Sequence, residues 1–368
     1  MRYQAVDFYR GVTIAFMIIV NSPGSWDEVF DPLQHAKWHG CTPTDLVFPS
    51  FMFIIGVSMW FSFGKNGRIW SSDIGWKILN RVSLLFLIGL LLNKFPIYWT
   101  DFDRWRIWGV PQRLALGYGL TAVLVLNFRR QWLIWIGGGL LLLYWGLLYW
   151  FGVPGQDPLA LETNAVLRID RWMLGEGHLY HGEGIAFDPE GLLSTIPSIV
   201  TVLLGWLAGE LLQYRSERRD LAVRDLLLYG ILCGFVGMFW DLFFPINKKL
   251  WTSSYVLYAG GISMLFLAAS VWLIEMRKWN WGRNFFATFG SNAIFAYVLS
   301  EVLLISCMAV SWVEAGGQRI NLWEWLFRNL SNLLGNAKLA SCLFAVAYML
   351  VCWLICRVLY NRKIFIKI

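Results

Sequence analysis

Long apolar runs separated by short polar connections dominate the pattern of this 368-residue chain. A helix that crosses a bilayer needs roughly 20 mostly apolar residues. By that criterion the pattern predicts about ten membrane-spanning helices, at residues 9–24, 46–64, 78–95, 109–127, 131–151, 192–213, 226–244, 252–275, 285–311 and 339–360. We therefore expect an all-α, polytopic integral membrane protein in which residues 1–368 form a single transmembrane domain.

The composition excludes a soluble fold. The chain is 57% hydrophobic and only 15% charged, whereas soluble domains carry about 25% charged residues. Its 23 tryptophans fit a membrane protein, because this residue gathers at membrane interfaces. The first apolar run follows Asp7 and Arg10 without a clear cleavage site, so we expect a retained helix and not a removed signal peptide.

The charge of the connections predicts an orientation. Basic residues gather in alternate connections and in the tail, at Lys65, Arg68, Lys77, Arg129, Arg130, Arg215, Arg218, Arg219, Arg224, Arg277, Lys278, Arg283, Arg357, Arg362, Lys363 and Lys367. Cytoplasmic loops are enriched in Lys and Arg, so we expect these connections and both termini in the cytoplasm. The acidic or mixed segments 24–45 and 152–190 then face outside. This orientation explains the net charge of +7 without a nucleic-acid partner.

Familiar cofactor and nucleophile motifs are missing from the sequence. Five of the six cysteines lie in apolar segments and no CxxC pair occurs, so we expect neither a metal site nor a disulfide framework. The chain also has no nucleophilic serine elbow, HExxH motif or glycine-rich phosphate loop.

The stretch 35–56 is the first place to look for chemistry, because a polar loop there runs directly into an apolar helix. Titratable residues at the edge of a membrane helix are costly unless they are used. His35 can act as a general base or accept an acyl group, and Asp45 can orient its ring. Alternatively, His35 is a solvated interfacial residue and Asp45 caps the helix that begins at Leu46. The residues alone leave both interpretations open.

Five further residues have polar side chains that need a reason. Asn21 ends the first apolar run, where it can bond a substrate carbonyl or satisfy the helix end. Arg113 lies inside an apolar run and should face a phosphate, a carboxylate or an internal acidic residue. Lys248 and Lys249 form a basic pair in an outer loop, which suggests an anionic ligand. Asn292 interrupts another apolar run.

Several segments occur in the same order in one known family: DFYRG, HAKWHGCTPTDLVFPSFMFIIG, RIWGVPQRL, IDRWMLGEGHLY, FDPEGLLSTIPS, PINKKLWTSSY and GSNAI. On these segments the chain resembles the heparan-α-glucosaminide N-acetyltransferase family, including its bacterial NagX-type homologues. The resemblance covers nearly the whole chain, and the second and fifth segments are its most specific parts. The family pattern favours Asn where this chain has His39, so no role is assigned to His39.

The resemblance implies a transmembrane enzyme that moves acetyl from acetyl-CoA to the amine of a terminal glucosamine. It implies that His35 is the active-site histidine, that Asn21 contacts acetyl-CoA and that Asp45 is an acidic partner. The remaining candidates, for cofactor binding, are Arg113, Lys248, Lys249 and Asn292.

The chemistry of these side chains agrees with that reaction. His35 can remove the amine proton or carry the acetyl group itself. Asn21 can donate a hydrogen bond to the developing oxyanion. Direct transfer and an acetyl-histidine intermediate both stay open.

Two other functional classes fit a polytopic chain. A transporter or permease for N-acetylglucosamine or a related sugar would also need many helices and intramembrane polar groups. A structural membrane protein would not need a His–Asp cluster. For the enzyme we expect acetyl-CoA, an amino-sugar acceptor and the lipid bilayer as partners, with a homodimer as the open alternative to a monomer. We expect the bacterial inner membrane as its location.

Overall fold

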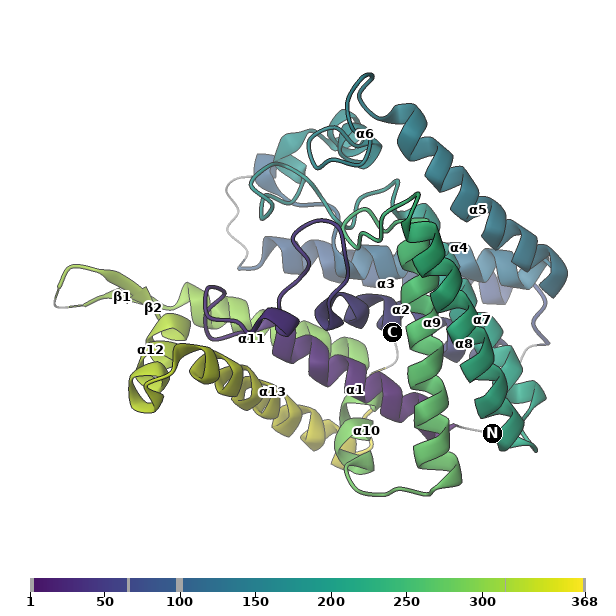
Figure 1. Cartoon of the computed structure of the whole chain (residues 1–368). Helices are drawn as coiled ribbons and strands as arrows, with labels where there is room; N and C mark the ends of the chain where they lie inside the picture. Colours follow the sequence, from purple (N-terminus) through teal and green to yellow (C-terminus); the bar gives the residue numbers. More distant parts are fainter. Residues whose placement is uncertain (1–2, 65–66, 97–101, 315, 367–368) are drawn as a thin grey trace.

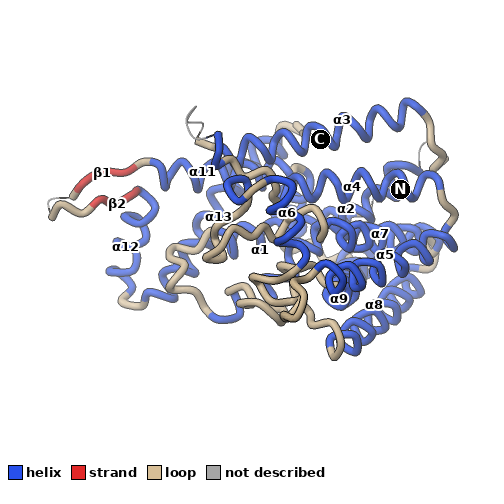
Figure 2. Tube along the Cα trace, turned by 90° about the horizontal axis from the view of Figure 1, so that it is seen from above, coloured by secondary structure: helices blue, strands red, loops and turns tan. Residues whose placement is uncertain are grey.

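The computed structural model describes residues 3–64, 67–96, 102–314 and 316–366, and these residues are mostly helical, with several long loops (Figures 1 and 2). The longer helices are α1 (Gln4–Asn21), α2 (Val47–Phe63), α3 (Ser72–Lys94), α4 (Val110–Asn127), α5 (Arg130–Phe151), α7 (Thr195–Tyr214), α8 (Arg219–Asp241), α9 (Ser253–Val271), α11 (Ala293–Ala309) and α13 (Ala337–Asn361). The shorter ones are α6 (Ala165–Leu174), α10 (Arg283–Ser291) and α12 (Leu322–Leu334). Strands β1 (Ser311–Val313) and β2 (Arg319–Asn321) form one antiparallel hairpin beside α12.

Seven helices of the described residues are long and apolar enough to cross a membrane, which confirms a polytopic membrane protein. They are Pro43–Phe63, Ser72–Lys94, Arg130–Phe151, Thr195–Tyr214, Arg219–Asp241, Ser253–Met276 and Ala337–Asn361. Helices α1 and α4 also coincide with predicted spans, but each has 18 residues and holds polar side chains such as Arg10 and Arg113. The total of ten spans therefore stays a prediction.

The predicted span 285–311 is two helices and not one. Helices α10 and α11 meet at an angle of 82° and together pass the test for a membrane span. The backbone of Asn292, between them, is not helical. Its side chain instead donates to the carbonyl of Ile364 (3.0 Å) and accepts from the amide of Ile366 (2.8 Å). The bend is therefore held by the chain's own tail, which the local pattern does not reveal.

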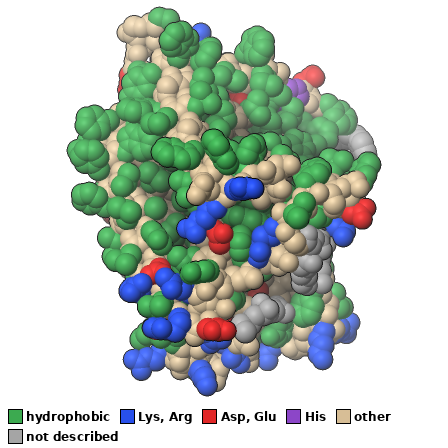
Figure 3. All heavy atoms as spheres, turned by 90° about the vertical axis from the view of Figure 1, so that its right-hand side faces the viewer, with side chains coloured by type: hydrophobic (Ala, Val, Ile, Leu, Met, Phe, Trp, Pro, Cys, Tyr) green, Lys and Arg blue, Asp and Glu red, His purple; other side chains and the backbone are tan. Residues whose placement is uncertain are grey.

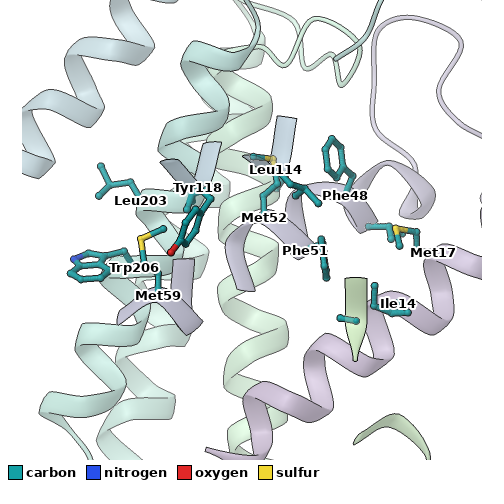
Figure 4. Close-up of a cluster of buried hydrophobic side chains, with 14 of the residues drawn as sticks. Ile14, Met17, Phe48, Phe51, Met52, Met59, Leu114, Tyr118, Leu203 and Trp206 are labelled. Atoms are coloured by element: carbon teal, nitrogen blue, oxygen red, sulfur yellow. The ribbon is translucent and has the colours of Figure 1, made fainter. Parts of the chain in front are cut away.

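Helices α2 and α7 lie at the centre of the bundle and touch backbone to backbone. A Cβ atom at Gly56 would lie 1.9 Å from the carbonyl oxygen of Val202, and one at Gly205 would lie 1.9 Å from that of Phe53. Small residues commonly allow such close approach between membrane helices. Figure 4 shows side chains of α2, α4 and α7 filling the adjoining core.

The basic connections predicted to be cytoplasmic meet at one end of the bundle. Four contacts link them to neighbouring helix ends: Arg68 to Gln213 (2.6 Å), Arg130 to Glu210 (3.5 Å), Arg219 to Glu275 (3.3 Å) and Arg283 to Gln4 (3.1 Å). Lys and Arg side chains gather in the lower half of Figure 3, whereas the upper half is largely hydrophobic. The connections that the charge pattern assigns to one side of the membrane therefore lie at one end of the bundle. Lys65 and Lys367 lie outside the described residues.

The long loops meet at the opposite end. The amide of Gly40 donates to the carbonyl of Ile246 at 2.7 Å, which joins the loop before α2 to the loop before α9. The Trp38 indole donates to the carbonyl of Leu159 at 2.9 Å, which joins the first of these loops to the segment before α6. Three segments that are far apart in the sequence therefore form one surface at this end.

Candidate active site

His35 and Asp45 form a close pair in this loop surface. His35 Nδ1 lies 2.6 Å from Asp45 Oδ1. The Asp45 side chain is 1% exposed, whereas that of His35 is 35% exposed. Nε2 of His35 has no hydrogen-bond partner among the described residues. A fixed, buried carboxylate therefore orients a ring whose other edge is open.

The local sequence explains why Asp45 is so firmly held. Pro43 begins a single 3-10 turn, Pro43–Leu46, that leads directly into α2. Within it, Asp45 Oδ2 accepts from the amide of Thr42 (3.0 Å), the Thr42 hydroxyl (3.1 Å) and the amide of Ala36 (3.0 Å). Asp45 is therefore not an N-cap, as the alternative interpretation had it. It is the third residue of a capping box, in which Oδ2 holds the turn and Oδ1 faces His35. The cap residue itself is Thr42.

Lys248 completes the cluster from the loop before α9. Its Nζ lies 3.3 Å from His35 Nδ1 and 3.8 Å from Asp45 Oδ1, and its side chain is 18% exposed. Asn247, fully buried next to it, fixes this loop by accepting from the amide of Leu250 at 2.8 Å. The Tyr255 hydroxyl, in α9, donates to the backbone carbonyl of Asp45 at 2.6 Å. Helix α9 and its preceding loop therefore brace the pair.

Electrostatics favour a neutral imidazole. Burial lowers the pKa of His35, and the Lys248 ammonium lowers this pKa further, against the opposing effect of Asp45. The carboxylate next to Nδ1 places the proton on that nitrogen, which leaves the Nε2 lone pair free. The arrangement is thus suited to accept a proton at Nε2. Burial also lowers the pKa of Lys248.

Asn21 stands apart from this hydrogen-bond network. It is the last residue of α1 and is half-buried at the loop end. Its side chain makes no hydrogen bond to a described residue, and no hydrogen bond joins it to His35. The amide is therefore available to a ligand, and its role stays a prediction.

Arg113 is fully buried in the first turn of α4, facing protein and not lipid. Its Nη2 donates to the carbonyl of Gly191 at 3.0 Å and to the Ser194 hydroxyl. The guanidinium carbon lies 5.1 Å from the centre of the Trp251 ring. Its Nε and Nη1 have no partner among the described residues.

The other two predicted binding residues are engaged elsewhere. Lys249 donates to the carbonyl of Lys37 at 2.8 Å and forms an ion pair with Glu183. It lies at the same end as His35 but is directed to different partners. Asn292 binds the tail, close to the basic end of the bundle. The structure therefore does not bring Asn292 to the His35 cluster.

A second cation, the half-buried Arg106, was not singled out by the sequence pattern. Its guanidinium donates to both carboxylate oxygens of Asp188 at 2.8 Å and to Glu190 at 2.7 Å. Burial lowers the pKa of Arg106, but these two carboxylates raise this pKa more strongly. The available signal was an arginine a few residues before the apolar run that contains Arg113. The network anchors the turn before α7, from which Gly191 contacts Arg113.

These features define a polytopic membrane protein with a His–Asp–Lys cluster at the loop end of its bundle. A family model described as "Heparan-alpha-glucosaminide N-acetyltransferase, catalytic" matches residues 2–238, and the chain belongs to this family. This confirms the family expected from the sequence motifs. The matched region contains His35 and Asp45 and ends before Lys248.

Two curated relatives align with the entire chain. Heparan-alpha-glucosaminide N-acetyltransferase from Homo sapiens is 30% identical over 429 residues, and that from Mus musculus is 30% identical over 425 residues. Each alignment covers 100% of this chain and 60% of the relative. The chain thus spans about 60% of the length of these relatives.

Proposed function

We propose that the chain is a membrane-embedded acetyltransferase that moves acetyl from acetyl-CoA to the amine of a terminal glucosamine or related amino sugar, on the outer side of the membrane. The observation that carries this proposal is the His35–Asp45 pair, with an open Nε2 edge at the loop end of the bundle. Membership of the family supports the reaction class.

His35 acts as general base in the direct form of this reaction. The amine nitrogen attacks the thioester carbonyl while Nε2 takes the amine proton. Asp45 stabilises the resulting imidazolium through Nδ1–H, as the third member of a triad does. Asn21, brought next to the carbonyl oxygen, donates to the oxyanion. The C–N bond forms, the C–S bond breaks, and the imidazolium returns its proton to the departing CoA thiolate.

Arg113 is the residue best suited to an anionic part of acetyl-CoA. Two of its nitrogens have no protein partner among the described residues, and a buried cation without a full set of partners is costly. Lys249 and Asn292 can bind a phosphate only by giving up the contacts they make. We therefore place the cofactor contact first at Arg113.

The membrane topology we propose has ten spans and both termini in the cytoplasm of a bacterium, with the chain in the inner membrane. The gathering of basic connections at one end of the bundle supports it. A reporter fused after residue 368 tests the orientation. Periplasmic activity of that reporter would contradict the proposal.

The decisive assay uses the full chain in lipid nanodiscs with isotopically labelled acetyl-CoA and a panel of amino sugars. Mass spectrometry should find a labelled N-acetyl sugar with the wild type. The His35→Ala variant should bind acetyl-CoA but transfer about 10²–10⁴-fold more slowly, the usual scale for a lost general base. His39→Ala is the matched control and should keep substantial activity. An active His35→Ala variant would remove the central claim.

A sugar transporter is the second candidate, because the broken span α10–α11 is a feature that transporters share. Proteoliposomes containing the chain would then take up N-acetylglucosamine without acetyl-CoA. Thermal stabilisation by acetyl-CoA, without such uptake, favours the enzyme.

A further inference from the structure

Lys248 stands in an unusual position for a ligand-binding lysine. Its ammonium lies 3.3 Å from the same His35 nitrogen that faces Asp45 at 2.6 Å. Nδ1 cannot both donate to the carboxylate and accept from the ammonium. Because the carboxylate is closer, Nδ1 carries the proton, and the ammonium is left as a positive charge next to an N–H group. Its nearest carboxylate oxygen is Asp45 Oδ1, at 3.8 Å.

We propose that Lys248 is a positioning residue of the acetyl-transfer site, whose ammonium keeps the His35 ring neutral between turnovers. This inference rests on the proposed function. It assigns Lys248 to the histidine. The alternative role for a lysine in this loop is to bind the CoA phosphates.

Charge balance is the physical reason. With a neutral ring, Asp45 and Lys248 cancel each other. Without Lys248, the carboxylate next to Nδ1 would favour the imidazolium. That cation carries a proton on Nε2 and cannot act as a base. The lysine therefore offsets the drawback of an orienting carboxylate, while the carboxylate still fixes the ring.

The other charged groups near His35 do not replace Lys248. Lys249 comes from the same loop, but its ammonium is directed to Glu183 and to a backbone carbonyl. Its effect on the pKa of His35 is the weakest of the charged neighbours. Cys41 lies in the loop of His35, and burial raises the pKa of its thiol to about 12, so it is uncharged near neutrality.

The protonation of His35 can be followed without any enzymatic activity. Diethyl pyrocarbonate reacts with neutral imidazole, so its rate of modification of His35, measured by mass spectrometry across pH, reports the pKa. We expect Lys248→Met to move the midpoint upward by about one unit or more. Lys248→Arg should stay near the wild type because it keeps the charge. Lys249→Met, the matched control, should shift it much less.

The dependence of kcat on pH should differ among the variants in the same way as the His35 midpoint. In Lys248→Met the acid limb of kcat should move to higher pH, with activity recovered at alkaline pH and unchanged acetyl-CoA affinity. A merely structural role would lower activity at every pH without moving the limb. If Lys248→Met does not fold, judged by thermal melting, Lys248→Gln serves as the second neutral variant.

The outcomes separate the two proposals. An unshifted His35 midpoint in a folded, neutral Lys248 variant would overturn the positioning role. So would weaker acetyl-CoA binding with an unshifted midpoint, which indicates a phosphate contact. A shifted midpoint in a protein that acetylates no amino sugar would support the role of Lys248 and reject the proposed function.

Discussion

Replacing Asp45 by asparagine tests the geometry of the pair with the smallest change in shape. Oδ2 of Asp45 accepts from three donors, whereas the partners of Oδ1 among the described residues are His35 and Lys248. Turning the amide group of Asn toward the three donors would leave them without an acceptor, at about 1–3 kcal/mol each. The amide oxygen should therefore keep the Oδ2 place, and the NH₂ group should face His35.

This placement forces the wrong tautomer on the histidine. An NH₂ group donates, so Nδ1 must accept and the ring proton moves to Nε2. The base is then absent from the side that faces the amine. We expect kcat to fall by about 10²–10⁴-fold, the contribution of general acid–base catalysis. The thermal stability of Asp45→Asn should stay close to that of the wild type, because all three donors to Oδ2 keep their acceptor.

The assay is the steady-state rate of acetyl transfer in nanodiscs, together with acetyl-CoA affinity by calorimetry and a thermal melt. Asp45→Ala is the comparison variant: it removes both functions, so it should lose activity and melt at a lower temperature. A rate within about tenfold of the wild type for Asp45→Asn would refute the reasoning. An equal loss of thermal stability in Asp45→Asn and Asp45→Ala would show that the amide oxygen does not take the place of Oδ2.

Three further changes test other parts of the structure. The pKa of His35 is lowered from the usual histidine value of about 6.5, so the ring should stay neutral somewhat below pH 6.5 and kcat should fall only as the pH drops through the lowered pKa. An acid limb of kcat centred well above pH 6.5 would contradict this. Gly205→Ala would place a Cβ 1.9 Å from the Phe53 carbonyl oxygen and should destabilise the bundle by about 1–3 kcal/mol or more. A Cβ at Gly138 would meet no described atom within 4 Å outside its own helix turn, so Gly138→Ala should melt like the wild type. Arg113→Leu should weaken acetyl-CoA binding in calorimetry, and unchanged affinity would leave Arg113 only its structural contacts.

Predictions from local patterns fared differently from those that need a packed fold. The apolar runs identified the helices because burial in a bilayer demands about 20 apolar residues in sequence. The break near Asn292 was visible as polar residues in an apolar run. Its cause was not, because the amide binds Ile364 and Ile366, more than 70 residues further along the chain. Asn292 therefore looked like a ligand-binding residue in the sequence alone.

The sequence by itself determined the membrane class, the family and the stretch that holds His35 and Asp45. These are local properties, since the two residues are ten positions apart on the loop and short turn that lead into α2. Only the tertiary structure placed Lys248 beside His35, 213 positions away, and joined Arg106 to Asp188 across 82 positions. Hydropathy predicts which segments enter the membrane but not which loops meet at its surface. That meeting depends on how the helices pack, and it decides the charge around the histidine.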